Sequence, residues 1–504
     1  MSAAHDDGPE VVIGPGRLRG TTDEGVLVFR GIPYAAPPVG TRRFRPPAPV
    51  APWSGCREAT EFSPVAPQNP SPLMAPAPQD EDCLAVNVWT PDLDGSAPVM
   101  VWIHGGGFTS GSGSAALYRG ARLARRGAVV VTLNYRLGVL GFTHLGGLGG
   151  DAWAGTGNLG LLDQVAALEW VQANIAAFGG DPDRITVFGE SAGAMSIGAL
   201  LGLPAAAGLF GRAILQSGAQ AHVHEPEDAE IVATELCAAL GIGPGELDRL
   251  REVPVDRLLA AQATVAARVG GGPGLAFQPV VDGAVLPRHP AEAVAAGAAA
   301  GIPLVVGTTL EETRLWTAMA GETAELAEEH LVARLARVLA DGAPSAHDAL
   351  AVYRRRLADR PASEVVTALG TDQVFRIPAV RLLERQAPHA PVRSYLFTHR
   401  SEAHGGLLGA CHAIELPFVF DTLDARGMRQ FVGDARPGTE ALAAAMADAW
   451  VAFARDGDPS SPGLGPWPAY DLDRRTTMVL DVAPRLEHDP LADERRLWAD
   501  RTGR

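Results

Sequence analysis

The chain has 504 residues, of which 47% are hydrophobic and 20% charged, a composition typical of a globular protein with a large core. Its 58 acidic and 42 basic side chains leave a formal net charge of -16, which repels phosphate backbones, so we expect no nucleic-acid partner. No run approaches the ~20 apolar residues that cross a bilayer, and the acidic first residues are unlike a secretory signal. We therefore expect a cytoplasmic protein without a membrane partner, as a monomer or small homo-oligomer.

Short runs rich in β-branched residues recur along the chain and predict strands. In chain order they cover residues 99–103, 128–133, 184–188, 213–216, 303–306, 392–397 and 477–482. Apolar residues at spacings of three and four predict a helix over residues 162–178, and residues 441–454 predict another. Strands that alternate with helices favour an α/β fold with a mainly parallel sheet covered by helices on both faces.

Two long segments rich in Ala, Leu and Glu, residues 226–268 and 323–358, predict further helices, which we expect to form cap insertions over one end of the sheet. The proline-rich residues 64–78 predict a loop. Because no internal repeat or long linker interrupts the chain, we expect residues 1–504 to form a single domain. The four cysteines are scattered and form no CxxC pair, which argues against a disulfide framework.

The sequence FGESAGA at residues 188–194 is the most informative motif of the chain. It follows a β-prone run and precedes a helix-prone one, and Gly-x-Ser-x-Gly in that setting is typical of a nucleophile elbow. So tight a turn strains the serine backbone and needs small neighbours, which Gly189, Ala192 and Gly193 supply. The motif predicts that Ser191 attacks a carbonyl carbon. The alternative is a glycine-rich turn that happens to hold a serine.

A nucleophilic serine needs a base, a carboxylate that orients the base, and donors for the oxyanion. The sequence HGGGF at residues 104–108 follows the predicted strand 99–103, and lipases and esterases use such a run to hold the oxyanion. We therefore assign the backbone N–H groups of Gly106, Gly107 and Ala192 as oxyanion donors. The alternative reading, a phosphate-binding loop, lacks the Lys and Ser/Thr of a P-loop.

Candidates for the acid and the base lie further along the chain. Glu311 and Glu312 follow the predicted strand 303–306, and a carboxylate at the carboxyl end of a strand reaches a crevice there. Either is a candidate acid, although both also suit the acidic first turn of a helix. His412, in the segment GACHAIELPF, is the candidate base, with His404 as a competitor. The order Ser, Glu, His is that of an α/β-hydrolase.

Further motifs are spread over nearly the whole chain. They are FRGIPYA at residues 29–35, EDCLAVNV at 81–88, NYR at 134–136 and GNLGLLDQ at 157–164. Together with FGESAGA, they make the chain resemble the type B carboxylesterases, the family of the bacterial para-nitrobenzyl esterases and the cholinesterases. The resemblance implies the α/β-hydrolase fold and hydrolysis of carboxylic esters without a cofactor.

The resemblance also implies roles for individual residues. It places the acid on Glu312 and the base on His412, which gives a triad with Ser191, and it implies that Glu190 tunes the electrostatics beside the nucleophile. With these roles a substitution of Glu311 is expected to be mild. The resemblance further implies two structural ion pairs, Arg43 with Glu81 and Arg136 with Asp163.

These assignments predict a serine carboxylesterase that forms an acyl-enzyme on Ser191 and releases an acid and an alcohol. The same machinery cleaves amides, carbamates and thioesters, which stay as alternatives. A more distant alternative is a non-catalytic binding protein of the cholinesterase type. We expect no metal, because His222 and His224 lack an HExxH motif and a third ligand nearby.

We expect the substrate to be a small-molecule ester, and six residues are candidates for the pocket that binds it. They are Phe108, Glu190, Phe277, Leu315, Trp316 and Met319. Each of the aromatic and apolar members suits the hydrophobic core as well as it suits a pocket wall, so the sequence leaves both readings open.

Overall fold

The computed structural model describes residues 8–71, 77–269, 275–319, 328–339, 345–434 and 436–499. The predicted loop at residues 64–78, the predicted helices at 323–358 and both ends of the predicted single domain lie partly outside these ranges. The single domain therefore stays a prediction.

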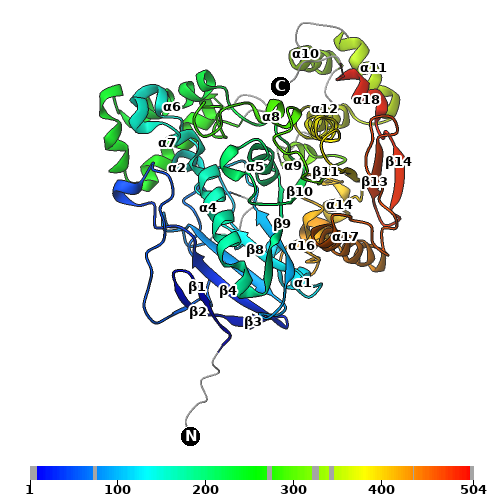
Figure 1. Cartoon of the computed structure of the whole chain (residues 1–504). Helices are drawn as coiled ribbons and strands as arrows, with labels where there is room; N and C mark the ends of the chain where they lie inside the picture. Colours follow the sequence, from blue (N-terminus) through cyan, green and yellow to red (C-terminus); the bar gives the residue numbers. More distant parts are fainter. Residues whose placement is uncertain are drawn as a thin grey trace.

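An 11-stranded sheet crosses the molecule, from β3 and β4 at the lower left of Figure 1 to β13 and β14 at the right. Its strands follow the order β14 (Arg485–His488), β13 (Thr476–Leu480), β12 (Val392–Phe397), β11 (Leu304–Thr309), β10 (Arg212–Gln216), β9 (Gly180–Glu190), β7 (Ala97–Ile103), β8 (Val129–Leu133), β6 (Ala85–Thr90), β4 (Val26–Pro33) and β3 (Thr21–Asp23). A small second sheet joins β1 (Glu10–Ile13), β2 (Gly16–Arg19) and β5 (Cys56–Glu58).

The seven runs that the sequence predicts as strands are β7 to β13. All of them pair in parallel, whereas β3, β4 and β6 at one edge and β14 at the other pair antiparallel. The prediction of an α/β fold with a mainly parallel sheet is therefore confirmed.

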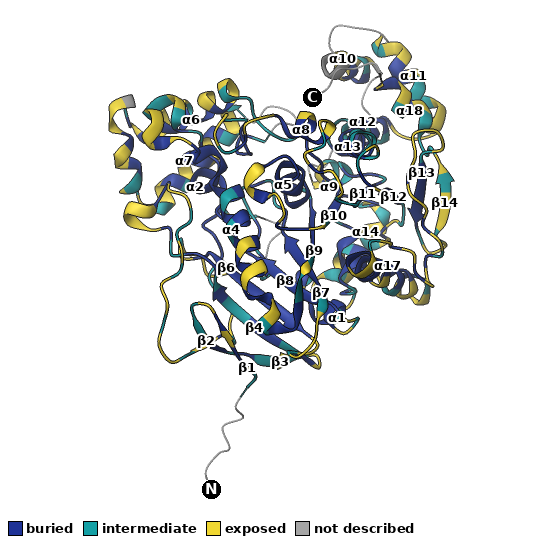
Figure 2. Ribbon diagram, in the orientation of Figure 1, coloured by how far each residue is buried: buried dark blue, intermediate teal, exposed yellow. Residues whose placement is uncertain are grey.

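Both faces of the sheet are buried, and β7 shows how its sequence achieves this. Val99, Val101 and Ile103 face one hydrophobic cluster, while Met100 and Trp102 face another. Because successive side chains of a strand point to opposite faces, an unbroken apolar run suits a strand with helices on both sides. Figure 2 shows the central strands as buried, between helices whose outer surfaces are exposed.

The long helices of the two faces belong to different clusters. The first cluster contains α4 (Leu159–Asn174), α5 (Ala192–Leu200), α6 (Pro226–Leu240), α7 (Val255–Val269) and α13 (Ile377–Gln386), and the second contains α1 (Ala121–Ala124) and α17 (Pro437–Asp456). The predicted helix at residues 162–178 corresponds to α4 and the 3-10 helix Ile175–Phe178 that follows it. The predicted helix at residues 441–454 lies within α17.

A third cluster packs at the edge of the molecule beyond β13 and β14, at the upper right of Figure 1. It is formed by α10 (Glu328–Leu339), α11 (Ala346–Arg356), α12 (Ala362–Thr371) and α18 (Ala492–Leu497). The remaining helices are short: α2 (Gly138–Gly141), α3 (Gly146–Gly149), α8 (Pro290–Ala295), α9 (Arg314–Met319), α14 (Ala403–Gly406), α15 (Leu416–Val419) and α16 (Met428–Val432). Within the described ranges, no helix combines the length and the apolar composition that crossing a membrane requires.

Both ion pairs that the resemblance implies are present. Arg136 and Asp163 are joined by two contacts, Nη2 to Oδ1 at 2.6 Å and Nε to Oδ2 at 2.8 Å, and their side chains are 4% and 0% exposed. Arg43 pairs with Glu81 in the same bidentate manner, at 2.5 and 2.8 Å. These pairs join segments that are distant in sequence. The guanidinium of Arg136 also donates to the carbonyl of Arg45, so it connects a third segment.

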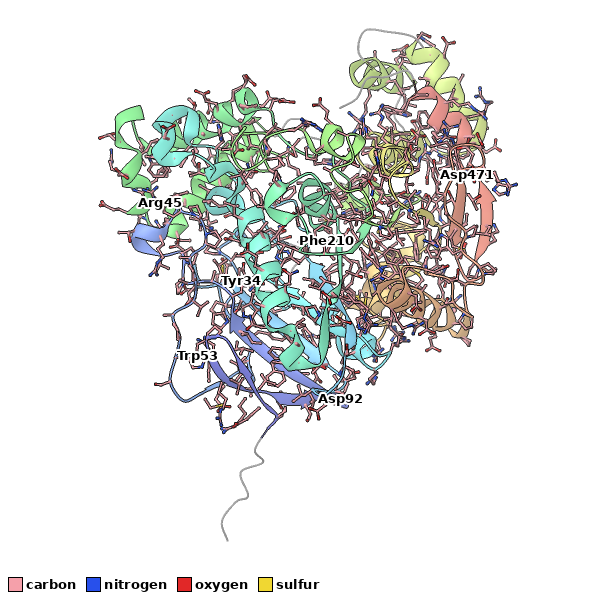
Figure 3. The ribbon with its side chains drawn as sticks, in the orientation of Figure 1. Tyr34, Arg45, Trp53, Asp92, Phe210 and Asp471 are labelled. Carbon is pink, nitrogen blue, oxygen red and sulfur yellow. The ribbon has the colours of Figure 1, made fainter. Side chains whose placement is uncertain are left out.

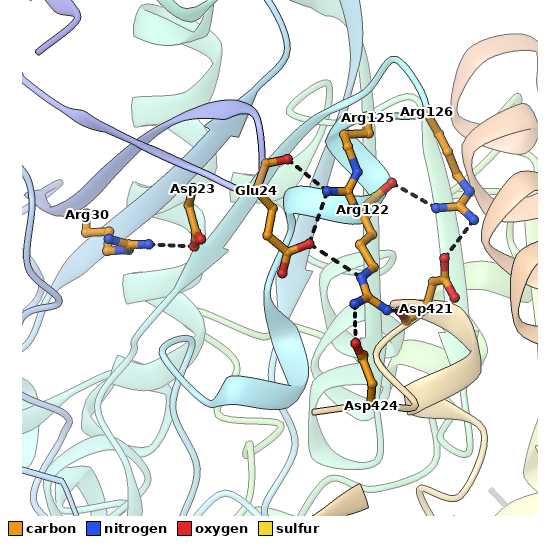
Figure 4. Close-up of polar contacts among 8 residues, drawn as sticks. All are labelled: Asp23, Glu24, Arg30, Arg122, Arg125, Arg126, Asp421 and Asp424. Atoms are coloured by element: carbon orange, nitrogen blue, oxygen red, sulfur yellow. Dashed lines mark hydrogen bonds and ion pairs between the residues drawn. The ribbon is translucent and has the colours of Figure 1, made fainter. Parts of the chain in front are cut away.

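Side chains fill the space between the layers, and Figure 3 labels Tyr34 and Phe210 among the buried ones and Asp471 at the periphery. A second network of ion pairs lies nearer the surface (Figure 4). There Glu24 in the β3–β4 turn contacts Arg122 and Arg125 at the end of α1. Arg122 and Arg126 in turn pair with Asp424 and Asp421, which follow α15. The network thus connects the edge strands with the segment that follows His412.

Candidate active site

Ser191 lies between β9 and α5, as the motif predicts. Its backbone has φ 55° and ψ -125°, a conformation that costs free energy for any residue with a Cβ. Two hydrogen bonds hold it there: its N–H donates to the carbonyl of Gln216 at 2.9 Å, and its carbonyl accepts from Met195 N–H at 2.8 Å. The turn therefore presents the hydroxyl at the carboxyl end of the parallel strands, where an open α/β sheet binds its ligands.

The small residues of the motif are required by the neighbouring strand β7. A Cβ on Gly193 would collide with the carbonyl oxygen of Ile103, and one on Gly189 would lie 2.7 Å from the same oxygen. Strand β7 therefore approaches the turn so closely that its last residue touches the backbone of the elbow. This contact brings the following segment, residues 104–108, beside Ser191.

His412 and Glu312 meet, although 100 residues separate them in the sequence. Nδ1 of His412 lies 2.7 Å from Oε2 of Glu312, whose other oxygen accepts from Thr309 N–H at 2.7 Å. The backbone N–H of His412 also donates to the carbonyl of Glu312 at 3.1 Å. Both side chains are buried, so the carboxylate fixes the orientation of the ring and the nitrogen that carries its proton.

The other ring nitrogen of His412 faces Glu190, the residue before Ser191. Nε2 lies 2.9 Å from Oε1 of Glu190 as a charge contact, since that oxygen has no hydrogen-bond partner of suitable angle in the described part of the chain. The hydrogen bonds of the described residues include none between Ser191 Oγ and His412. The ring thus reaches the nucleophile elbow, with Nε2 turned to the carboxylate beside the serine.

Two carboxylates govern the protonation of His412. Burial favours the neutral ring and lowers its pKa, but the charges and contacts of Glu190 and Glu312 outweigh burial, so the pKa of His412 lies well above 6.5. In this arrangement the two carboxylates favour the protonated form of the ring.

The glycine-rich segment after β7 lies against the elbow. A Cβ on Gly105 would lie 2.9 Å from Oε2 of Glu190 and 3.0 Å from Cβ of Ser191, so the segment passes next to the nucleophile. Gly106 and Gly107 have φ values of 114° and 60°, which residues with side chains rarely adopt. Their N–H groups and that of Ala192 donate to no other group among the described residues. An oxyanion hole requires such unused backbone donors, and the segment that carries two of them passes next to Ser191 at Gly105.

His104 anchors the start of this segment and stays neutral. Its ring stacks on Tyr135 with centroids 4.5 Å apart, and the Tyr135 hydroxyl donates to the His104 carbonyl at 2.9 Å. Burial lowers the pKa of His104 to about 4, against the effect of a hydrogen bond with the Gly105 carbonyl. It therefore supports the loop without adding charge near the site.

A third carboxylate lies behind the first two. Glu415 is fully buried and accepts from Gln216 Nε2 at 3.2 Å, and Gln216 accepts in turn from Trp450 Nε1 at 3.0 Å. Burial, followed by repulsion from Glu190 and Glu312, raises the pKa of Glu415 to about 8. Its surroundings therefore favour the protonated form of Glu415.

Two aromatic rings contact the ring of His412. Trp316 and Phe375 lie 4.9 and 4.8 Å from it, centroid to centroid, and they stack on each other at an interplanar angle of 7°. Trp316, a predicted pocket residue, is 43% exposed and so offers a face to a bound molecule. Phe375 carries no signal in the sequence, because a single apolar residue inside a helical segment belongs to no motif.

The other predicted pocket residues have different surroundings. Phe108, Phe277 and Leu315 are at most 4% exposed and belong to the hydrophobic clusters, whereas Met319 is half exposed. Glu190 touches His412 directly, as described above. A wall role for Phe108, Phe277, Leu315 and Met319 stays a prediction.

The competing histidines lie elsewhere. His404 is exposed in α14, and no described hydrogen bond or ion pair joins it to Glu311 or Glu312. Among the described residues, no group of three or more His, Cys, Asp or Glu side chains is arranged to hold an ion.

Comparison with known proteins agrees with this geometry. A sequence profile of the Carboxylesterase family matches residues 7–498. The chain is 43% identical to the para-nitrobenzyl esterase of Bacillus subtilis, over 95% of this chain and 96% of that protein, and 39% identical to the phenmedipham hydrolase of Pseudarthrobacter oxydans, over 92% and 93%. A crystal structure of a Geobacillus stearothermophilus carboxylesterase matches with a TM-score of 0.88 and 46% identity, over 97% of this chain and 99% of that one. The chain therefore belongs to the carboxylesterase family, has the α/β-hydrolase fold and is a carboxylic ester hydrolase.

Proposed function

We propose that the protein is a serine carboxylesterase in which Ser191 forms the acyl-enzyme, His412 moves the protons and Glu312 orients His412. The observation that carries the proposal is the position of the buried His412 ring. One ring nitrogen lies 2.7 Å from Glu312, and the other points at the residue next to Ser191. A base, its orienting carboxylate and a strained serine thus converge at the carboxyl end of the sheet.

In the first half of the proposed reaction, Oγ of Ser191 bonds to the ester carbonyl carbon while Nε2 of His412 takes the hydroxyl proton. The carbonyl oxygen becomes an oxyanion, held by the N–H groups of Gly106, Gly107 and Ala192. Because Ala192 is the first residue of α5, the positive end of that helix also favours this charge. The bond to the alcohol then breaks, and the alcohol leaves with the proton from His412.

In the second half, a water molecule gives a proton to His412 as its oxygen bonds to the acyl carbon. Collapse of this intermediate breaks the bond to Oγ, returns the proton to Ser191 and releases the carboxylic acid. Glu312 stays ionised throughout and stabilises the imidazolium that forms in each half.

Before the first step, His412 must lose the proton that it holds between Glu190 and Glu312. A well-aligned hydrogen bond holds Nδ1 to Glu312, whereas the contact of Nε2 with Glu190 is poorly aligned. The proposed reaction requires the ring to move so that Nε2 leaves Glu190 and accepts from Ser191 Oγ. Catalytic hydrogen bonds commonly tighten in this way only when substrate is bound.

The substrate that we propose is a small ester with an aromatic group. The exposed part of Trp316 presents apolar surface beside His412, and one relative is a para-nitrobenzyl esterase. We propose para-nitrobenzyl esters as the first substrates to test, against matched amides and thioesters, which the same groups could cleave.

Replacement of the nucleophile tests the proposal. Ser191→Ala is expected to lower kcat for a para-nitrobenzyl ester by about 10⁶, as in other serine hydrolases with a triad, while the fold is retained. The measurement combines steady-state kinetics with labelling by a fluorophosphonate probe, which should modify the unaltered protein and leave Ser191→Ala unlabelled. A variant that keeps most of its activity, or that is still labelled, would show that another residue is the nucleophile.

A further inference from the structure

Glu311, the acid that the triad does not use, is buried with its side chain 8% exposed. Its described side-chain contacts do not include His412, yet Oε2 accepts a hydrogen bond from the backbone N–H of Ala410 at 2.9 Å. Ala410 precedes His412 by two residues, so Glu311 holds the segment that carries the base.

Two arginines fix the other oxygen of the same carboxylate. Nη2 of Arg314 lies 2.8 Å and Nη2 of Arg400 lies 3.0 Å from Oε1 of Glu311. Arg314 belongs to α9 and also pairs with Glu364 of α12. Glu311 therefore ties the segment of His412 to two helices and to the residues that follow β12.

Backbone contacts reinforce this connection on both sides of the acid pair. The N–H of Glu311 donates to the carbonyl of Ala410 at 3.0 Å, and the N–H of His412 donates to the carbonyl of Glu312 at 3.1 Å. The two segments therefore lie side by side and run in the same direction. The Glu311 side chain closes a second hydrogen bond around the same residue, Ala410.

The chain leaves room for this carboxylate at Gly409. Gly409 has a φ of 54°, and a Cβ there would collide with Oε2 of Glu311. A glycine is needed at this point for the backbone conformation and also for the close approach of Glu311 to Ala410 N–H.

We propose that Glu311 is a positioning residue, which holds residues 409–412 so that the His412 ring lies between Glu312 and the nucleophile. This proposal rests on the proposed function of the Ser191 site. Glu311 does not touch substrate; it acts through the backbone of the segment that bears the base.

A carboxylate is required at position 311 because both of its oxygens accept hydrogen bonds from N–H groups. A glutamine at position 311 has one accepting oxygen and one donating amide nitrogen. If the oxygen faces the arginines, the amide faces the N–H of Ala410, and if it faces Ala410 the amide faces the guanidinium groups. In either orientation donor meets donor, so the segment that carries His412 shifts.

The test compares Glu311→Gln with Glu364→Gln, which removes a carboxylate from the same Arg314 but leaves the contact with Ala410 intact. In contrast to the mild effect expected from the sequence, these contacts predict that Glu311→Gln lowers kcat by about 10- to 100-fold with little change in KM, the scale of a misplaced catalytic group. Glu364→Gln is expected to leave kcat nearly unchanged. Both variants are assayed where circular dichroism shows them folded. An equal effect of the two substitutions, or a loss confined to KM, would overturn the proposal.

A second pair of variants tests the same contact from the other side. Gly409→Ala should push Oε2 of Glu311 off Ala410 and lower kcat in the same way. Gly405→Ala is the control, because Gly405 has a similar φ of 68° and nothing within 4 Å of its would-be Cβ. If Gly405→Ala lowers kcat as much as Gly409→Ala does, backbone strain explains the loss and the role of Glu311 is refuted.

Ser191→Ala separates this proposal from the proposed function. If Ser191→Ala retains activity, the catalytic assignment itself has failed, whatever Glu311→Gln does. If Ser191→Ala is inactive and folded Glu311→Gln keeps its kcat, only the positioning role is wrong.

Discussion

His412 lies between two anions, and this controls the pH at which the proposed base is available. Glu312 holds Nδ1 and Glu190 lies against Nε2, and together they raise the pKa of the ring well above 6.5 despite its burial. A raised pKa means that the folded protein keeps the proton to higher pH. Since only the neutral ring accepts a proton from Ser191, activity should rise with pH through the pKa of His412.

Removal of one of the two charges should move this transition. Glu190→Gln takes away an anion that favours the imidazolium, so the pKa of His412 should fall, and the acid limb of kcat/KM should move to lower pH by about one unit or more. The measurement is a profile of kcat/KM against pH for a para-nitrobenzyl ester. Glu169→Gln, a change on the exposed face of α4, is the control and should leave the limb in place. If the acid limb of Glu190→Gln remains at the same pH or moves to higher pH, Glu190 does not control the protonation of His412.

At the scale of elements, the site depends on the contact between the end of β7 and the turn from β9 into α5. The carbonyl of Ile103 touches the backbone at Gly189 and Gly193, so strand and turn are in contact without side chains between them. The spacing of these elements decides where the N–H groups of Gly106 and Gly107 lie relative to Ser191. An added methyl group at this contact should disturb the nucleophile and the oxyanion donors together.

Gly193→Ala tests this contact. The new Cβ would collide with the Ile103 carbonyl, so the turn and β7 must separate, and we expect kcat to fall on the order of 10², as for other small misplacements of catalytic groups. Gly211→Ala, at a glycine with open space around its would-be Cβ just before β10, should have almost no effect. Activity of Gly193→Ala equal to that of Gly211→Ala would mean that the contact is looser than the structure indicates.

At the scale of the whole molecule, buried ion pairs join segments that the sheet alone does not connect. Arg136 follows β8, Asp163 belongs to α4, and the same guanidinium reaches the carbonyl of Arg45. Breaking a buried pair leaves an uncompensated charge inside the protein, which costs about 3–5 kcal/mol. Such a pair ties the amino-terminal segment to the core beneath the site.

Asp163→Asn should therefore lower the free energy of unfolding by about 3–5 kcal/mol, because it leaves Arg136 buried without its anion. The measurement is denaturant unfolding followed by circular dichroism and fluorescence. Glu487→Gln, which breaks the exposed pair with Arg485 on β14, should change stability little. A small loss in Asp163→Asn would indicate that water or another group compensates Arg136.

Local sequence patterns predict much of the architecture. The seven predicted strands are β7 to β13, because strands buried on both faces are continuous apolar runs that stand out in the sequence. The antiparallel strands β3, β4, β6 and β14 were not predicted: β14 is exposed and carries mixed, polar residues, whereas β6 is buried but has polar Asn87 and Thr90 among its apolar residues. The motif at Ser191 and the glycines after β7 are equally local, because tight turns demand particular small residues.

The sequence by itself determined the fold class, the family and the position of the strained serine, since each depends on residues that are neighbours along the chain. Only the tertiary structure decided what surrounds His412: Glu190 at one nitrogen, Phe375 and Trp316 on the ring, and Glu311 behind its segment. These residues come from distant parts of the chain, and no local sequence pattern predicts that they surround one ring. Their distances and burial set the charge of the base, and folding alone determines both.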